Sequence, residues 1–138
     1  MTVPMEYSDA TARFDRFLME AAGEADLVTR HQAYTMVEGV LRAFARRLTA
    51  EEAIRFAQVL PPLLRSLFVA GWTPEEPRPR FVDRAALVKE VQALRRHHNL
   101  APDTAIPNVA AALRRHVDPA AFDACLDILP EGARDFWA

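Results

Sequence analysis

Cysteine and glycine are scarce in this sequence and long apolar runs are absent, and each of these features argues against a class of structure. Cys125 is the only cysteine, so no disulfide can form within the chain, and a reducing compartment such as the bacterial cytoplasm is expected. The four glycines form no phosphate-binding loop or nucleophile elbow, which argues against a nucleotide site. No stretch approaches the roughly 18 apolar residues of a membrane span, and residues 1–7 do not resemble a signal peptide.

Positive charge is not in excess either. The 138 residues carry 17 Lys and Arg against 19 Asp and Glu, a net charge of −2, which disfavours a general nucleic-acid-binding protein. Sixteen of the 17 basic residues are arginine, which is typical of a GC-rich coding sequence. The length and the apolar fraction of 51% predict one globular domain over residues 1–138, large enough to fold without a disulfide or a metal.

The chain contains an internal repeat. Residues 40–68 and 109–137 align without a gap, 69 residues apart. Six of the aligned pairs are identical: Val40/Val109, Ala43/Ala112, Arg46/Arg115, Leu60/Leu129, Pro61/Pro130 and Arg65/Arg134. Abundant alanine and the absence of β-branched runs favour helix in both copies. We therefore predict an all-α fold of two tandem four-segment helical repeats packed with pseudo-twofold symmetry, formed by residues 8–72 and 83–138 and joined by a proline-rich linker at 73–82.

Capping and breaking residues predict where the eight helical segments begin and end. Thr29 and Thr49 each precede a Gln or a Glu by three residues, which is the spacing of a capping box. Asp83 is expected to cap a helix that ends near Asn99, and Gly71 is expected to end an earlier helix in the left-handed conformation. The first helices of the two copies align at a spacing of 73, which predicts that the second copy lacks about one helical turn.

Several short motifs resemble those of a known family. They are Leu41-Arg42-Ala43-Phe44, Thr49-Ala50-Glu51-Glu52-Ala53, Gln58-Val59-Leu60-Pro61, Leu63-Leu64-Arg65, Gly71-Trp72 and, in the second copy, Leu129-Pro130 with Arg134-Asp135-Phe136-Trp137. Over residues 14–137 the chain resembles the bacterial family called domain of unknown function 2267. The resemblance implies an all-helical tandem repeat in a cytoplasmic bacterial protein, and it carries no assigned activity. The second copy departs from the pattern at Pro107 and Gly132, so the two halves need not present the same surface.

Two pairs of residues are candidate contacts for a partner or an anion. Arg65 and Arg134 are equivalent in the two copies, and two guanidinium groups related by symmetry could bind carboxylates or an anion. The structural alternative is an internal ion pair or a capping contact that holds the Leu-Pro turn. Trp72 follows a glycine and Trp137 is the penultimate residue, so both could be exposed anchors for a partner helix or for self-association, or could close the core between the halves.

Three basic clusters fall at predicted helix C-termini, at residues 46–47, 95–98 and 114–116. Their charges complement the helix dipole, and a phosphate-binding surface would require the clusters to converge in space. The two adjacent histidines of the second cluster diverge on a helix, so they cannot readily share one metal ion. Cys125 lies on an apolar stripe without an activating cation, which indicates a core residue. We expect no metal and no cofactor.

These observations favour a small helical protein-interaction or self-association module without catalysis. Two alternatives stay open: an anion or nucleic-acid binder that uses arginine clusters at helix ends, and a small-molecule-binding protein or enzyme with a site between the repeats. The expected partner is an unknown protein or a second copy of the chain. Charge disfavours nucleic acid, and hydropathy disfavours a membrane.

Overall fold

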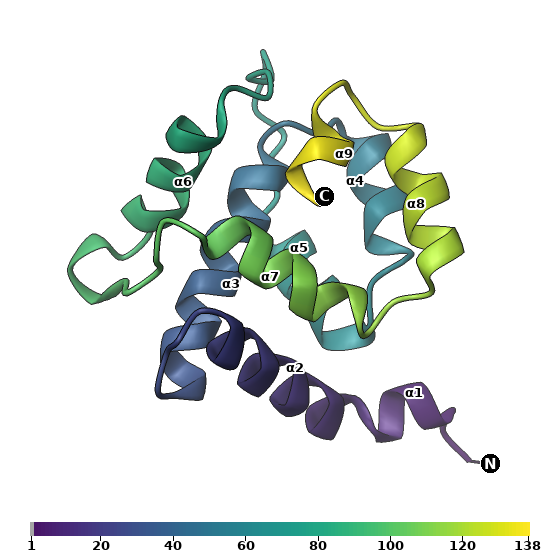
Figure 1. Cartoon of the computed structure of the whole chain (residues 1–138). Helices are drawn as coiled ribbons and strands as arrows, with labels where there is room; N and C mark the ends of the chain where they lie inside the picture. Colours follow the sequence, from purple (N-terminus) through teal and green to yellow (C-terminus); the bar gives the residue numbers. More distant parts are fainter. Residues whose placement is uncertain (1) are drawn as a thin grey trace.

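Within residues 2–138, the range that the computed structural model describes, all regular structure is helical (Figure 1). The first half contains α1 (Met5–Ser8), α2 (Ala10–Glu24), α3 (Arg30–Ala45), α4 (Ala50–Ala57) and α5 (Pro62–Ala70). The second half contains α6 (Arg84–Ala93), the 3-10 turn η1 (Arg96–His98), α7 (Ala105–Arg114), α8 (Pro119–Asp127) and α9 (Ala133–Phe136). The all-α prediction is confirmed, and α1 and η1 are additional to the eight predicted segments.

Side-chain caps begin several helices where the sequence predicts them. The Thr29 hydroxyl accepts a hydrogen bond from the Gln32 backbone N–H at 3.1 Å, and the Gln32 side chain accepts one from the Thr29 N–H at 3.2 Å. Thr49 and Glu52 form the same capping box at the start of α4. Aspartates cap α6 and α8. Each cap satisfies an N–H group that the first turn leaves without a partner, which stabilises the helix by about 1 kcal/mol.

The end of α6 differs from the prediction. The expected end near Asn99 is wrong, because the helix stops at Ala93 and Arg95 adopts a left-handed backbone conformation with φ of 50°. The Asn99 amide donates hydrogen bonds to the carbonyls of Val91 and Leu94 at 2.9 and 2.7 Å. These bonds satisfy carbonyls that the end of a helix leaves unpaired. A side-chain contact therefore sets this boundary, and helix propensity does not.

The backbone of Gly71 also differs from the prediction. Its φ of −90° is right-handed, so the expected left-handed cap is wrong. The missing Cβ matters for a different reason: a Cβ at this position would lie 3.0 Å from Cγ of Arg42. The glycine allows the end of α5 to lie close to α3.

The helices α2 and α6 start 74 positions apart, at Ala10 and Arg84, but they match at shorter spacings toward their ends. The left-handed residues that follow α2 and α6 are Asp26 and Arg95, which are 69 positions apart. Buried positions on the two helices match at a spacing of 70: Phe17/Leu87, Leu18/Val88 and Ala21/Val91. The helices of the second half are nevertheless shorter here, because α6 has 10 residues against 15 in α2, and α7 has 10 against 16 in α3. Its residues 99–104 are irregular where the first copy begins α3.

Helices from the two halves pack on one another. α2 lies against α7, and α3 lies against α6 (Figure 1). The approach of α3 to α6 depends on Gly39, because a Cβ at this position would lie 2.7 Å from the Val91 carbonyl oxygen. Each half therefore covers apolar helix surface of the other half.

Aromatic side chains fill the core between the halves. Phe44 contacts Phe136 and Trp137, with ring centroids 5.0 and 5.3 Å apart, and Phe56 contacts Phe122 at 5.9 Å. The buried residues of both halves form one continuous cluster. Burial of one such side chain contributes roughly 1.5–3 kcal/mol, so the core stabilises both halves together.

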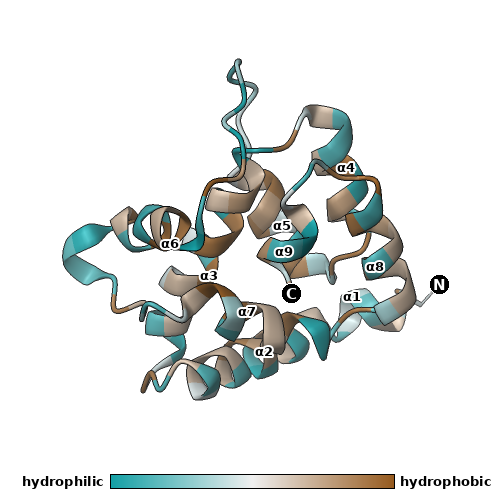
Figure 2. Ribbon diagram, turned by 45° about the horizontal axis from the view of Figure 1, so that its top comes forward, coloured by the Kyte–Doolittle hydropathy of each residue, from teal (hydrophilic) through white to brown (hydrophobic). Residues whose placement is uncertain are grey.

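The proline-rich linker leaves the helical core between α5 and α6. Residues 73–80 project beyond the helices and are mostly hydrophilic (Figure 2). No helix in the described part of the chain is both long and apolar enough to span a membrane. The end of the linker returns to lie beside α9, and these two segments form the walls of the candidate site.

Candidate functional site

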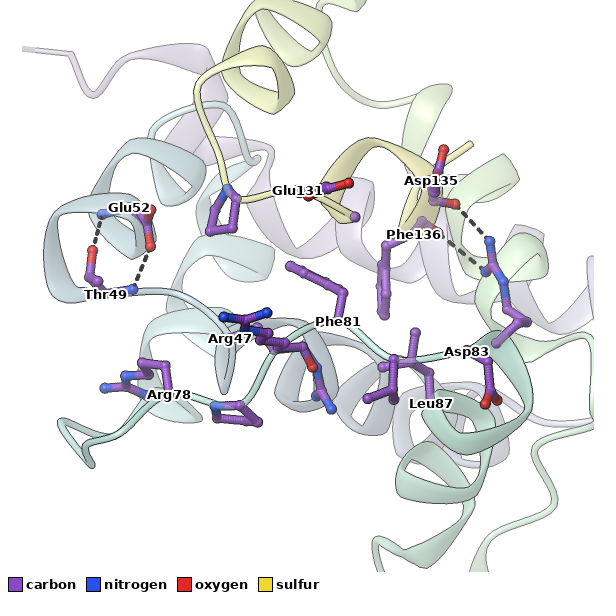
Figure 3. Close-up of a pocket in the computed structure, with 16 residues that line it drawn as sticks. Arg47, Thr49, Glu52, Arg78, Phe81, Asp83, Leu87, Glu131, Asp135 and Phe136 are labelled. Carbon is purple, nitrogen blue, oxygen red and sulfur yellow. Dashed lines mark hydrogen bonds between the residues drawn. The ribbon is translucent and has the colours of Figure 1, made fainter.

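An open groove with a volume of about 980 Å³ lies between the linker and the C-terminal segment (Figure 3). Residues 78–84 form one wall, and residues of the segment 130–136 form the other. Residues of the segment 47–52 contribute at one end. We call this hollow the linker groove. Its walls are far apart in the sequence, so only the folded chain can form it.

Arg47 lies beneath the groove, with 5% of its surface exposed. Its guanidinium donates to the carbonyls of Ala43 and Arg80 at 2.7 and 3.0 Å, and to the Glu90 carboxylate at 3.0 Å. Arg46 donates to the same carboxylate at 2.6 Å. The buried charge is tolerated because it is both paired and hydrogen-bonded. These bonds join α3, the linker and α6 at one point.

Glu90 forms ion pairs with both arginines. Burial raises the pKa of Glu90, but hydrogen bonds and attraction from Arg47 and Arg46 outweigh burial and hold this pKa below its usual value of 4.5. Glu90 is therefore ionised at neutral pH. Removing it would leave the buried Arg47 without its charged partner, which costs about 3 kcal/mol in comparable pairs.

Trp72 and Arg78 hold the linker against α3. The Trp72 indole N–H donates to the Leu48 carbonyl at 2.9 Å, and the Arg78 guanidinium lies 4.7 Å from the centroid of the Trp72 ring. Arg78 also donates to the carbonyls of Arg46 and Thr73. A cation over an indole face and bonds to backbone atoms both restrict the position of the chain. The linker wall of the groove therefore has a defined position.

Phe81 anchors the linker to the second half. Its ring packs on Phe44 and Phe136, with centroids 5.6 and 6.0 Å apart. Gly132 has a φ of 98°, and a Cβ at this position would lie 2.5 Å from the Phe81 Cβ. Glycine is therefore required both for the backbone conformation and for the contact. This explains why glycine is present at the position that aligns with Leu63.

The two walls of the groove differ in charge: the linker wall carries three arginines and Asp83, which caps α6, whereas the charged residues of the other wall are acidic. Arg78 and Arg80 lie on the linker wall, whereas Glu131 and Asp135 lie on the other wall (Figure 3). The side chains of Arg80, Glu131 and Asp135 are exposed, and none forms a hydrogen bond or ion pair with another of the described residues. Arg84 donates to two backbone carbonyls of α9 and joins the walls at one end. The groove thus presents uncompensated charge of both signs.

Arg65 and Arg134, two of the predicted site residues, each hold the end of a neighbouring helix. Arg65 donates to two backbone carbonyls at the C-terminal end of α4, at 3.0 and 2.9 Å. Arg134 donates to the Asp123 carbonyl at 3.1 Å and to the Asp127 carboxylate, which raises the pKa of Arg134. These contacts match the structural alternative, as a capping contact for Arg65 and an internal ion pair with Asp127 for Arg134. A contact of either arginine with a partner stays a prediction.

The two predicted tryptophans have different environments. Trp137 is fully buried, with its ring 5.7 Å from Phe56 and 6.1 Å from Phe122. Its indole N–H has no acceptor within residues 2–138. Trp72 is partly buried and tied to the backbone. Trp137 closes the core between the halves, and it would have to leave the core to contact a partner. None of the four predicted residues lines the linker groove.

Two of the three basic clusters are paired with acidic residues. Arg46 and Arg47 share Glu90, as described above. In the third cluster, Arg115 pairs with Glu20 and Glu24, and His116 lies 2.6 Å from Glu20. The clusters at 46–47 and 114–116 therefore serve contacts between the halves. The cluster at 95–98 is exposed and forms no such pair within the described range.

Cys125 is a core residue with 7% of its surface exposed. Burial raises the pKa of its thiol, and the charge of Arg55 opposes this effect only in part. In the part of the chain that the structure describes, no three His, Cys, Asp or Glu residues are grouped as metal ligands would be. Cys125 therefore has neither the exposure nor the thiolate character of a nucleophile.

Reasoning from the sequence missed the residues that build the groove. Phe81 had a detectable signal, because it is the only aromatic residue between positions 73 and 82. Arg47 and Glu90 had none, because they are 43 positions apart and meet only when α3 packs on α6. Gly132 was singled out as a departure from the repeat, but its partner could not be inferred from spacing.

Comparison with known proteins identifies a family but assigns no activity. A family model described as uncharacterized conserved protein (DUF2267) matches residues 14–136, which include both halves. A comparison with curated proteins finds no match. The matched range covers most of α2 and every later helix. The chain therefore belongs to the DUF2267 family, as its motifs indicate.

Proposed function

We propose that this protein is a self-associating interaction module, in which the linker groove of one copy docks on the same groove of a second copy. The observation that carries the proposal is the charge on the two rims. Arg80 is exposed on one rim, and Glu131 and Asp135 are exposed on the other, all uncompensated within residues 2–138. Such a surface is complementary to itself after a twofold rotation. Arg80 of each copy then pairs with an acidic residue of the other.

Apolar residues in the groove supply the rest of the interface. Val82 is 48% exposed on the linker wall, and Phe81 is half-buried beside it. Pro79 and Pro130 line the opposing walls. Removal of this surface from water favours association by about 25 cal/mol per Å² of apolar area. The charges set the register of the two copies, and the apolar surface contributes affinity.

We also infer that the two halves are copies of one helical unit related by an approximate twofold axis. Two observations support this inference. The contacts of α2 with α7 and of α3 with α6 involve equivalent pairs of elements with the halves exchanged. Arg46 and Arg115 are 69 positions apart, and each bonds to a glutamate on the first helix of the other half, Glu90 and Glu24. The single buried thiol suits a reducing compartment, and we place the protein in the bacterial cytoplasm.

Sedimentation equilibrium and charge reversal test the proposed interface. The wild-type chain is expected to form reversible dimers between micromolar and millimolar concentration. Arg80→Glu is expected to weaken dimerisation about tenfold or more, because both rims become acidic. Glu131→Arg is expected to weaken it for the opposite reason. A mixture of the two variants is expected to form mixed dimers, because each variant supplies the charge that the other lacks.

Arg16→Glu is the matched control, since Arg16 is exposed on α2 and does not line the groove. This variant should dimerise like the wild type. A wild-type chain that stays monomeric at millimolar concentration would overturn the proposal. Groove variants that dimerise as the control does would also overturn it, because the interface would then lie elsewhere.

A further inference from the structure

A loop at the far end of α6 carries four consecutive basic residues, at positions 95–98. We call residues 94–101 the basic loop. It projects beyond α6 and is coloured as hydrophilic over most of its length (Figures 1 and 2). All four basic side chains are exposed, and none forms a hydrogen bond or ion pair with other residues of the described chain. The other two basic clusters are paired with glutamates, so this loop is exceptional in the molecule.

The basic loop has a defined backbone. The Asn99 amide donates to the carbonyls of Val91 and Leu94 at 2.9 and 2.7 Å, and its oxygen accepts from the Ala101 N–H at 2.9 Å. Gln92 donates to the Ala101 carbonyl at 2.9 Å. Two of these bonds, from Asn99 to Val91 and from Gln92 to Ala101, tie the loop to α6, and the other two lie within the loop. The basic side chains are thus presented from an ordered loop.

Acidic residues near the loop in sequence are already engaged. Glu90 accepts hydrogen bonds from Arg46 and Arg47. Asp103 accepts one from the Gln92 amide at 3.0 Å. Neither carboxylate forms an ion pair with a basic side chain of the loop among residues 2–138. The loop therefore offers two neighbouring exposed arginines that pair with no carboxylate of the described residues.

The rest of the molecule is acidic. Without the two arginines of the loop, the chain has 15 Lys and Arg against 19 Asp and Glu, a net charge of −4. A long polyanion such as nucleic acid, or an anionic membrane, would extend beyond the loop and meet the rest of a chain whose net charge is negative. A small anion would meet the loop alone. The charge distribution therefore favours a compact ligand.

We propose that the basic loop binds a phosphate monoester, carried by a small molecule or by a phosphorylated side chain. Arg95 and Arg96 offer two guanidinium groups, each of which can donate two parallel hydrogen bonds to phosphate oxygens. A monoester carries close to two negative charges at neutral pH and matches two arginines. Leu100 is 57% exposed beside them and can contact the organic group that carries the phosphate.

Isothermal titration calorimetry with phosphoserine and with a phosphoserine peptide tests the site. Both ligands are expected to bind with a Kd on the order of 1 mM or tighter, whereas serine and the unphosphorylated peptide are not. Tighter binding of the peptide would identify a protein as the source of the phosphate, and equal binding would identify a small molecule. Arg95→Gly with Arg96→Gln is expected to weaken binding about tenfold or more. Glycine at position 95 keeps the left-handed backbone.

Two further variants distinguish binding by the ordered loop from nonspecific attraction of an anion to positive charge. Arg16→Gln removes an exposed arginine from α2 and should bind phosphoserine as the wild type does. Asn99→Ala keeps all four basic residues but removes the bonds that order the loop, and it should weaken binding while thermal unfolding confirms a folded chain. Unchanged affinity in Asn99→Ala would overturn the proposal. Tighter binding of an oligonucleotide or of anionic vesicles than of either phosphoserine ligand would also overturn it.

This site is independent of the linker groove. The groove lies at the start of α6 and the basic loop at its end, and a ten-residue helix is about 15 Å long. Loss of phosphate binding with intact dimers would therefore contradict only the basic-loop proposal. Loss of dimers with intact phosphate binding would contradict only the proposed function.

Discussion

Gly132 lies directly against Phe81, so closely that a Cβ on the glycine would be 2.5 Å from the Cβ of the phenylalanine. The contact joins the linker to the turn before α9. It therefore fixes the two walls of the linker groove relative to each other. The glycine also has a φ of 98°, a conformation that other residues adopt only with strain.

Gly132→Ala is expected to lower the free energy of unfolding by about 3 kcal/mol. Roughly 1 kcal/mol comes from the positive φ, and about 2 kcal/mol from the overlap with Phe81. Urea denaturation at neutral pH measures the difference. Gly23→Ala is the control: its Cβ meets nothing within 4 Å and it lies inside α2, so the free energy should rise by about 0.5–1 kcal/mol. Equal stability of Gly132→Ala and the wild type would contradict the tight contact.

Glu90→Gln is expected to destabilise the protein at neutral pH and to have less effect in acid. The folded-state pKa of Glu90 is below 4.5, so its charged contacts add stability above the unfolded-state pKa. That stability is lost as the pH falls through the folded-state pKa. At pH 7 we expect a loss of about 2 kcal/mol, because Arg47 is buried and loses its charged partner.

Urea denaturation of Glu90→Gln and of the wild type, at pH 7 and at about pH 3, measures how the difference in free energy of unfolding depends on pH. The difference in free energy of unfolding between the two proteins should be smaller at the lower pH, where the wild-type carboxylate takes up a proton. Glu51→Gln is the control, since Glu51 forms an exposed pair with Arg55 worth little stability. A gap that does not change with pH would show that the contribution of Glu90 does not depend on its charge.

The two tryptophans are expected to respond differently to replacement by phenylalanine. Trp72→Phe removes the hydrogen bond to the Leu48 carbonyl and should cost about 1–2 kcal/mol. Trp137→Phe leaves a small cavity, which costs about 1 kcal/mol, but it also removes a buried N–H that has no acceptor within the described residues. The two effects offset each other, so Trp137→Phe should be nearly neutral. Chemical denaturation of both variants compares them, and a larger loss for Trp137→Phe would contradict this account.

Cys125 is expected to react slowly with iodoacetamide in the folded protein. The thiol is buried and its pKa is raised, so both access and the thiolate fraction are low. Mass spectrometry at about pH 8 should show alkylation at least about tenfold slower than in urea. Equal rates in the two conditions would show that the α8 segment opens readily.

Local signals in the sequence predicted most helix starts. The capping boxes at Thr29 and Thr49 and the cap at Asp83 formed where expected, because a cap uses side-chain and backbone groups only three residues apart. Helix ends were harder to predict than helix starts. Asn99 ended α6 early by bonding back to Val91 and Leu94. Such a bond competes with helix continuation and leaves no simple pattern in the sequence.

The residues of the candidate site could not be predicted from the sequence. Arg47 was visible only as part of a basic cluster, and its buried position depends on Glu90, 43 positions away. The predicted residues Arg65 and Arg134 were found to bind helix ends instead of lining a hollow. A groove is formed by the approach of distant segments, and single-sequence patterns report only near neighbours.

The sequence alone determined that the chain is helical, and its motifs indicated the family. Both properties follow from local propensity, capping and short motifs, which act within a few residues. The tertiary structure alone decided that α3 packs on α6, that Phe81 meets Gly132, and that one of three basic clusters stays uncompensated. These features depend on pairs of residues far apart in sequence, and their positions are fixed only when the core brings the two halves together.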